Sequence, residues 1–160
     1  MKIFHRNDFM KTFCLSSLLL IFIIGTSKAD TFTFDPDGRP LTIYVDEESP
    51  SVVQCALTMF CDDYKCVFGD SPQRVNRDKA DIIVECSENS NWEHFDISVS
   101  RQGRLYVKGS DPRGTAYGIL ELSRLIGISP WVWWADVPPQ KLNSYTLPDG
   151  YHNSQQPSVQ

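Results

Sequence analysis

A short segment beginning at Gly109 has several residue types of a phosphate-binding loop. Gly109 and Gly114 are separated by four residues, and the segment lies between an alternating run and an amphipathic run. The lysine of that motif is absent, Pro112 lacks a backbone N–H, and Asp111 places a carboxylate where a phosphate would bind. We therefore predict no nucleotide site. Instead, Asp111 caps a helix, Gly114 lets the helix approach a strand, and Arg113 pairs with Asp111 or with a neighbouring domain.

Three tryptophans follow this helix at positions 131, 133 and 134. The run Trp131 to Ala135 is predicted as a strand, on which Trp131 and Trp133 share one face and Trp134 takes the other. Indole faces stack on sugar rings, but large aromatic side chains also fill cores and domain interfaces. Asp136 is close enough in sequence to accept a hydrogen bond from an indole N–H. Sugar binding and apolar packing therefore both stay open for this cluster.

No catalytic residue is assigned from the sequence. The chain has no GxSxG motif, and His94 and His152 do not lie beside a serine or cysteine in a recognisable pattern. Glycosidases need two carboxylates that flank the scissile bond, and no pair is marked by spacing here. The available carboxylates are Asp62, Asp63, Glu85, Asp96, Glu121 and Asp136. Each is interpreted as a surface charge or a cap, and no cofactor is predicted.

Four cysteines follow the N-terminal segment, and three of them fall on one predicted helix. Cys55 and Cys66 lie about 16 Å apart along that helix, and Cys61 and Cys66 point about 140° apart, so no pair within the helix forms a disulfide. Cys86 could pair with one of them, but we interpret the helix cysteines as small apolar residues that pack. Without a CxxC motif or a nearby pair of histidines, no metal site is predicted.

Residues 1–29 are typical of a secretory signal peptide. They combine a basic start, an apolar run from Phe13 to Ile24 that is short for a membrane span, and small residues at Ser27 and Ala29. An uncleaved anchor is the alternative. The remaining residues carry a net charge of −8, which argues against nucleic acid or an anionic membrane as partner. We expect an exported protein, periplasmic or extracellular.

The remaining chain is predicted as one α/β domain over residues 30–139. Strands are expected at Leu41 to Val45 and Ala80 to Cys86, with a helix between them that Ser49 caps and Gly69 ends, so this unit favours a parallel strand pair. A hairpin is expected from Phe95 to Lys108. A second helix then runs to a stop at Gly127. The result is a mixed sheet covered by two main helices, followed by a polar linker over residues 140–160.

The segment GSDPRGTAYGILELSRLIGISPWVWWADVP resembles the N-terminal domain of glycoside hydrolase family 115, the xylan α-glucuronidases. The helix VVQCALTMFCDDYKCVFGDSP and the closing PSVQ resemble the family as well. The Arg-Gly-Thr-x-Tyr-Gly core of the first segment, residues 113–118, is similar, more loosely, to the accessory α/β domains of hexosaminidases and other α-glucuronidases.

The resemblance implies an enzyme that removes glucuronic acid, or its 4-O-methyl form, from xylan with two carboxyl groups acting as acid and base. In the family those groups lie on a (β/α)8 barrel, which needs about 250 residues and has no counterpart before Gln160. We therefore expect a domain that is inactive alone, truncated before the barrel, and able to dock to a barrel. The alternative is a stand-alone carbohydrate-binding or interaction module that uses the three tryptophans.

Overall fold

The computed structural model describes residues 31–35, 39–87 and 92–157. The strands are β1 (Thr33–Phe34), β2 (Thr42–Tyr44), β3 (Gln73–Arg74), β4 (Ile82–Cys86), β5 (Phe95–Val99), β6 (Leu105–Gly109), β7 (Tyr145–Thr146) and β8 (His152–Gln155). The helices are α2 (Ser51–Phe68), the 3-10 turn η2 (Arg77–Lys79), α3 (Pro112–Leu125) and α4 (Trp131–Ala135). The predicted signal peptide lies outside the described residues.

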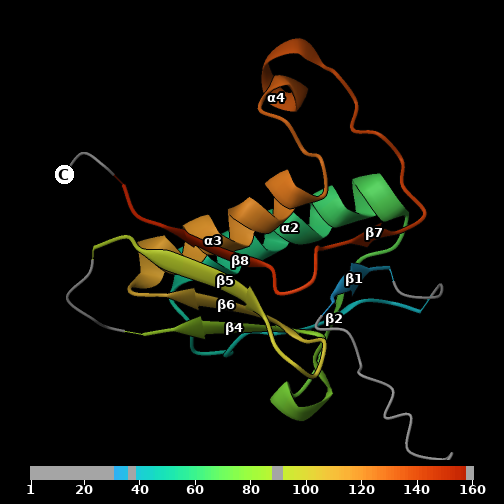
Figure 1. Ribbon diagram of the computed structural model, residues 1–160. Helices are drawn as coiled ribbons and strands as arrows, with labels where there is room; N and C mark the ends of the chain where they lie inside the picture. Colours follow the sequence, from blue (N-terminus) through green and yellow to red (C-terminus); the bar gives the residue numbers. More distant parts are fainter. Residues whose placement is uncertain (1–30, 36–38, 88–91, 158–160) are drawn as a thin grey trace, which may run out of the picture.

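The main sheet has the strand order β3-β2-β4-β6-β5-β8, and β1 pairs with β7 in a separate two-stranded ribbon. Strands β3, β2, β4 and β6 run parallel, whereas β5 is antiparallel to both β6 and β8. Figure 1 shows α2 and α3 side by side on one face of this sheet. The described residues place no second helix layer on the opposite face, which we call the open face. The predicted α/β class, the parallel pair around α2 and the β5–β6 hairpin are therefore confirmed.

Helix α2 forms because apolar residues recur at helical spacing and meet the sheet. Its buried stripe is formed by Val53, Ala56, Leu57, Phe60, Tyr64 and Val67. Gly69 ends the helix in the left-handed conformation, with φ of 101°, which a residue with a Cβ rarely adopts. Pro50, rather than Ser49, is the residue that precedes the first helical turn, so the predicted Ser49 cap is wrong.

Helix α3 has well-defined ends. Asp111 is its N-cap, and its Oδ1 accepts a hydrogen bond from the Gly114 N–H at 2.6 Å. At the other end, the Gly127 N–H donates to the Arg124 carbonyl and the Ile128 N–H to the Ser123 carbonyl, each at 3.0 Å. These two bonds are the Schellman arrangement, which satisfies carbonyls that the helix leaves free. The predicted start and stop of this helix are confirmed.

The strand predicted at Trp131 to Ala135 is wrong, because these residues form α4. The Val132 N–H donates to the Ser129 carbonyl at 3.0 Å, so the chain turns helically directly after Pro130. A five-residue aromatic run cannot indicate its own periodicity, since its pattern fits a strand or a helical turn equally well. None of the strand pairings described in the structure includes this segment.

The polar linker predicted over residues 140–160 is also wrong in part, because it contains β7 and β8. Strand β8 forms the edge of the main sheet and pairs with β5. Its sequence, His-Asn-Ser-Gln, has no apolar alternation because the strand is mostly solvent-exposed and is held by backbone hydrogen bonds. Strand β3 is likewise polar and short, and it pairs with β2.

The cysteine interpretation needs correction. The four cysteines of the described residues are free, but three of them are exposed and only Cys61 is partly buried against the core. Cys55 and Cys66 fall on the outer side of α2, so they do not pack as small core residues.

In the part of the chain that the structure covers, no helix has both the length and the apolar character needed to cross a membrane.

Candidate functional site

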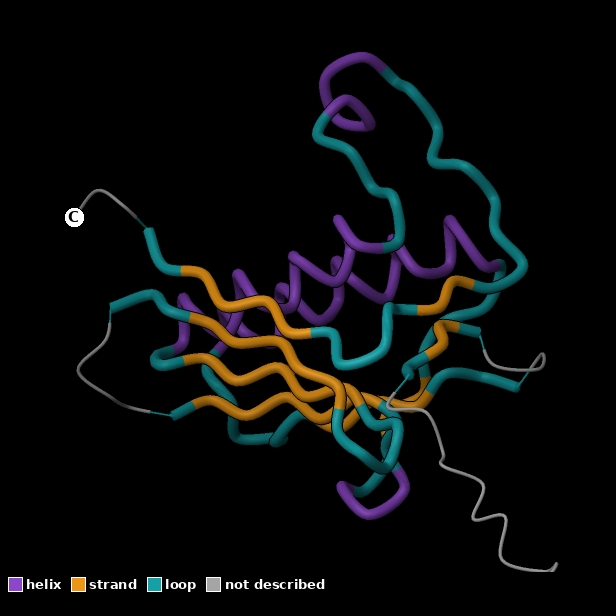
Figure 2. Tube along the Cα trace, in the orientation of Figure 1, coloured by secondary structure: helices purple, strands orange, loops and turns teal. Residues whose placement is uncertain are grey.

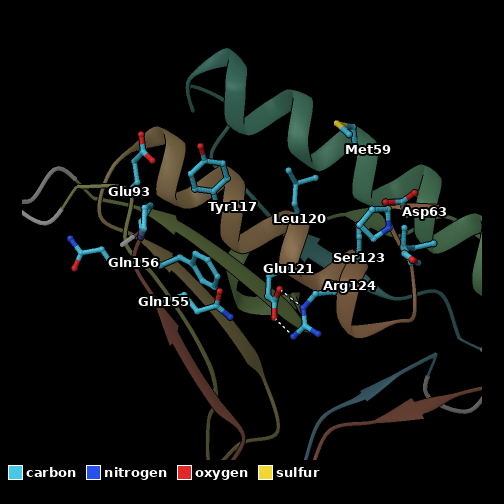
Figure 3. A pocket seen from close by; sticks show the side chains of 15 residues that line it. Met59, Asp63, Glu93, Tyr117, Leu120, Glu121, Ser123, Arg124, Gln155 and Gln156 are labelled. Carbon is cyan, nitrogen blue, oxygen red and sulfur yellow. Dashed lines mark hydrogen bonds and ion pairs between the residues drawn. The ribbon is translucent and has the colours of Figure 1, made fainter. Parts of the chain in front are cut away.

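An open groove of about 580 Å³ runs along the outer side of the helix layer. Figure 3 shows Met59 and Asp63 contributed by α2, Tyr117, Leu120 and Arg124 by α3, and Gln155 by β8. Ser129 and Pro130 line it where the chain leaves α3, and Pro157 lines it after β8. The groove therefore joins the helix layer, the sheet edge and the last described residues in one surface feature.

A buried carboxylate links α3 to the edge strand inside this groove. Glu121 is 8% exposed, and its Oε2 accepts from the Arg124 Nε at 2.7 Å while its Oε1 accepts from the Asn153 Nδ2 at 2.9 Å. Asn153 lies on β8, whose side chains alternate between the helix side and the open side of the sheet. The charge of Glu121 is thus matched, which a buried carboxylate requires.

Two further carboxylates line the groove, and they differ in whether they form an ion pair. Glu93 forms an ion pair with Arg113 at 2.6 Å, so Arg113 pairs with Glu93 rather than with the predicted Asp111. Asp63 forms no ion pair with any described residue. Burial between the helices raises the pKa of the Asp63 carboxyl; the Ser123 hydroxyl opposes this rise, and the charge of Asp62 adds to it.

The segment that resembles a phosphate loop is filled by its own carboxylate. Asp111 accepts hydrogen bonds from the Gly114 N–H and, at 2.8 Å, from the Glu93 N–H. A Cβ on Gly114 would lie 2.4 Å from the His94 carbonyl oxygen, so α3 and the residues before β5 touch through backbone atoms. The Gly114 and Glu93 N–H groups are already hydrogen-bonded to the Asp111 carboxylate, so the segment does not present an anion site.

The tryptophans lie on a loop that rises from the body of the domain (Figures 1 and 2). We call residues 129–141 the arm. Its bases are fixed by buried Ile128 and by a hydrogen bond from the Leu142 N–H to the Val67 carbonyl at 3.1 Å. Trp131 and Trp134 are 66% and 84% exposed. The side chain of Trp133 is outside the described part of the structure.

Two of the remaining carboxylates belong to the open face of the sheet. Glu85 forms ion pairs with Arg77 and, at 3.6 Å, with Lys108, while Asp96 meets His152 at 2.6 Å. Asp62 and Asp136 are exposed. Of the six carboxylates considered from sequence, three therefore form ion pairs: Glu85 and Asp96 on the open face, and Glu121 in the groove. Among the described residues, no group of three or more His, Cys, Asp or Glu side chains could hold a metal ion.

The groove was not predicted from the sequence, because the residues that line it have the pattern of an ordinary solvent-facing helix surface. Leu120 on α3 is only partly buried and lines the groove together with Tyr117. The spacing of three between these two apolar residues, on the side away from the core, is the signal that could have indicated it.

Among the solved structures that this chain resembles is a family 115 4-O-methyl-α-glucuronidase described as specific for decorated arabinogalactans. It is 34% identical over 80% of this chain, with a TM-score of 0.73. This chain covers 19% of that enzyme's length, so it spans about one fifth of the relative. The predicted resemblance to the N-terminal domain of family 115 is confirmed.

Two bacterial hexosaminidases share the fold alone. The Streptomyces plicatus N-acetyl-β-hexosaminidase is 13% identical, with a TM-score of 0.58, and matches 80% of this chain and 23% of its own. The family 20 β-N-acetylhexosaminidase from Streptomyces coelicolor is 14% identical, with a TM-score of 0.57, over 80% and 24% of the two chains. No protein-family model matches the sequence, and no curated protein matches it significantly.

Proposed function

This chain has the N-terminal α/β domain type of glycoside hydrolase family 115, and on that premise we propose that it is a non-catalytic part of an exported α-glucuronidase. One observation carries the proposal: 80% of the chain matches only 19% of a family 115 enzyme. The described carboxylates support it, since those on the open face serve in ion pairs and Glu121 and Glu93 are each held by an arginine. The domain acts by completing the fold of a catalytic domain.

The substrate class follows from the bond that such enzymes cleave. The family 115 relative is named as a 4-O-methyl-α-glucuronidase with specificity for decorated arabinogalactans, whereas the sequence resemblance implies xylan. The relative's name and the sequence resemblance share one side chain, an α-linked 4-O-methylglucuronic acid. We propose that side chain as the target of the complete enzyme and leave the polymer backbone to experiment.

The test is an assay of uronic acid release by the purified chain. Glucuronoxylan and a glucuronic-acid-decorated arabinogalactan are incubated with the chain alone and with the chain mixed with a family 115 enzyme that lacks the matching segment. We expect no release by the chain alone, and release that rises on mixing. Release by the purified chain alone refutes the non-catalytic role.

The exposure of Trp131 and Trp134 favours a second candidate, a carbohydrate-binding module. Three residues apart on a helix, the two side chains lie on neighbouring sides of α4, where both indoles can meet one ligand. Titration with xylo-oligosaccharides and arabinogalactan oligosaccharides would change the tryptophan fluorescence if this function holds. Unchanged fluorescence at millimolar sugar removes this candidate.

A further inference from the structure

The outer side of the helix layer is more apolar than a solvent-facing helix surface needs to be. Met59 on α2 and Tyr117 on α3 are each 37% exposed, and Leu120 lies beside them in the groove. The inner sides of both helices already cover the sheet, so these residues are not required by the core. Apolar side chains that gather in a groove commonly mark a protein-interaction site.

The arm extends this apolar surface. Ser129 and Pro130 form the end of the groove and lead directly into α4, which carries the two exposed tryptophans. Val137, farther along the arm, is also exposed. Figure 1 shows the arm rising from the helix side of the domain where α3 ends, so the groove and the arm adjoin at Ser129 and Pro130.

The charges in the groove are matched except at one position. Arg124 neutralises Glu121, and Arg113 neutralises Glu93. Asp63 has no ion-pair partner among the described residues, although it is partly buried beside Ser123. A partner that fills an apolar groove around a lone carboxylate needs a cationic side chain opposite it, because a buried unpaired charge is costly.

The occupant follows from where the chain runs. Gln156 and Pro157 follow β8 and line the groove, so a domain joined to them is tethered at its end. In the family 115 relative, about four-fifths of the chain lies outside the segment that this domain matches. A tethered domain has a high effective concentration at the surface beside its tether.

We propose that the groove and the arm are the docking surface for the catalytic domain of the same enzyme. An apolar ridge of that domain fills the groove, one arginine or lysine pairs with Asp63, and Trp131 and Trp134 pack against its flank. The open face of the sheet is not part of the interface. This inference rests on the proposed function, because it takes a glycosidase domain as the partner.

The binding partner for the test is the family 115 4-O-methyl-α-glucuronidase with its matching segment deleted, and affinity is measured by calorimetry with the full 160-residue chain. Asp63→Asn should weaken binding about tenfold, since it leaves the partner's cation without a counter-charge. Trp134→Ala should weaken it roughly 30-fold, because the partner covers the exposed indole. Two controls, Asp62→Asn on the exposed neighbour and Arg101→Ala in the β5–β6 turn, should change the Kd less than about twofold.

A chimera provides the second format in case the truncated enzyme does not fold. Residues 31–157 replace the matching segment of the relative, and unfolding is followed by calorimetry. We expect one coupled transition for the unmodified groove and two separate transitions for Asp63→Asn combined with Trp134→Ala.

Equal effects of groove and control substitutions overturn the docking surface but leave the proposed function standing. Failure to bind in trans together with uncoupled unfolding of the unmodified chimera overturns the docking surface, whereas uronic acid release by the chain alone refutes the non-catalytic role.

Discussion

Replacing Gly114 with alanine tests a close backbone contact between α3 and the residues before β5. The new Cβ would lie 2.4 Å from the His94 carbonyl oxygen and 2.9 Å from the Glu93 carbonyl carbon. A carbon–oxygen contact normally needs about 3.3 Å, so α3 and this segment must separate by about 0.9 Å. The neighbours are backbone atoms between a cap and a strand, and they cannot turn away as a side chain can.

The separation disturbs the bonds that join the start of α3 to the residues before β5. Asp111 accepts from Gly114 and Glu93, and Ser110 donates its N–H to the His94 carbonyl at 2.9 Å. Overpacking costs about 1–3 kcal/mol and a damaged cap about 1 kcal/mol. Because alanine has a higher helix propensity than glycine, the substitution also stabilises the helix by at most about 1 kcal/mol. We expect a net loss near 2 kcal/mol, which lowers the Tm by roughly 8 °C.

The assay is urea and thermal unfolding followed by circular dichroism, with Gly118→Ala as the comparison. The Cβ at position 118 meets side-chain atoms, Val107 Cγ1 at 2.7 Å and Phe95 Cβ at 3.2 Å. Since side chains can shift, the loss there should be smaller. A Gly114→Ala protein that is as stable as the unmodified chain, or more stable than Gly118→Ala, would refute the reasoning.

Three further predictions concern polar groups. Burial alone would raise the pKa of Asp81, but hydrogen bonds from Arg39 and Thr42 outweigh it and hold the pKa below the ordinary value. Asp81→Asn should therefore cost about 1–2 kcal/mol at neutral pH. Because an acid with a lowered pKa stabilises the fold above its unfolded pKa, this difference should shrink as the pH falls below about 4, as urea unfolding at several pH values can check. Glu121→Ala and Asn153→Ala should show a coupling of about 0.5–3 kcal/mol in a double-mutant cycle of unfolding free energies, and additive losses would exclude a link from α3 to β8. A thiol reagent should modify Cys61 more slowly than the three exposed cysteines, because burial raises the pKa of its thiol, and equal rates would contradict this.

The sequence determined the elements whose signals are local. The apolar stripe of α2 follows from helical spacing, and the limits of α3 follow from Asp111, Pro112 and Gly127. The β5–β6 hairpin follows from two alternating runs around a turn with Gly103. In each case the side chains that specify the structure are close in the chain to the backbone they constrain.

Only the tertiary structure decided the rest, because the deciding partners are distant in the chain. Strand β8 is polar and becomes a strand through its pairing with β5, and the run at Trp131 turns helical without a strand partner. The groove exists because α2, α3 and the end of β8 meet in space, so neither the unmatched charge of Asp63 nor the exposure of Trp134 could be predicted from spacing. Local chemistry thus specified the helices and the hairpin, and their packing created the surface on which the proposed function depends.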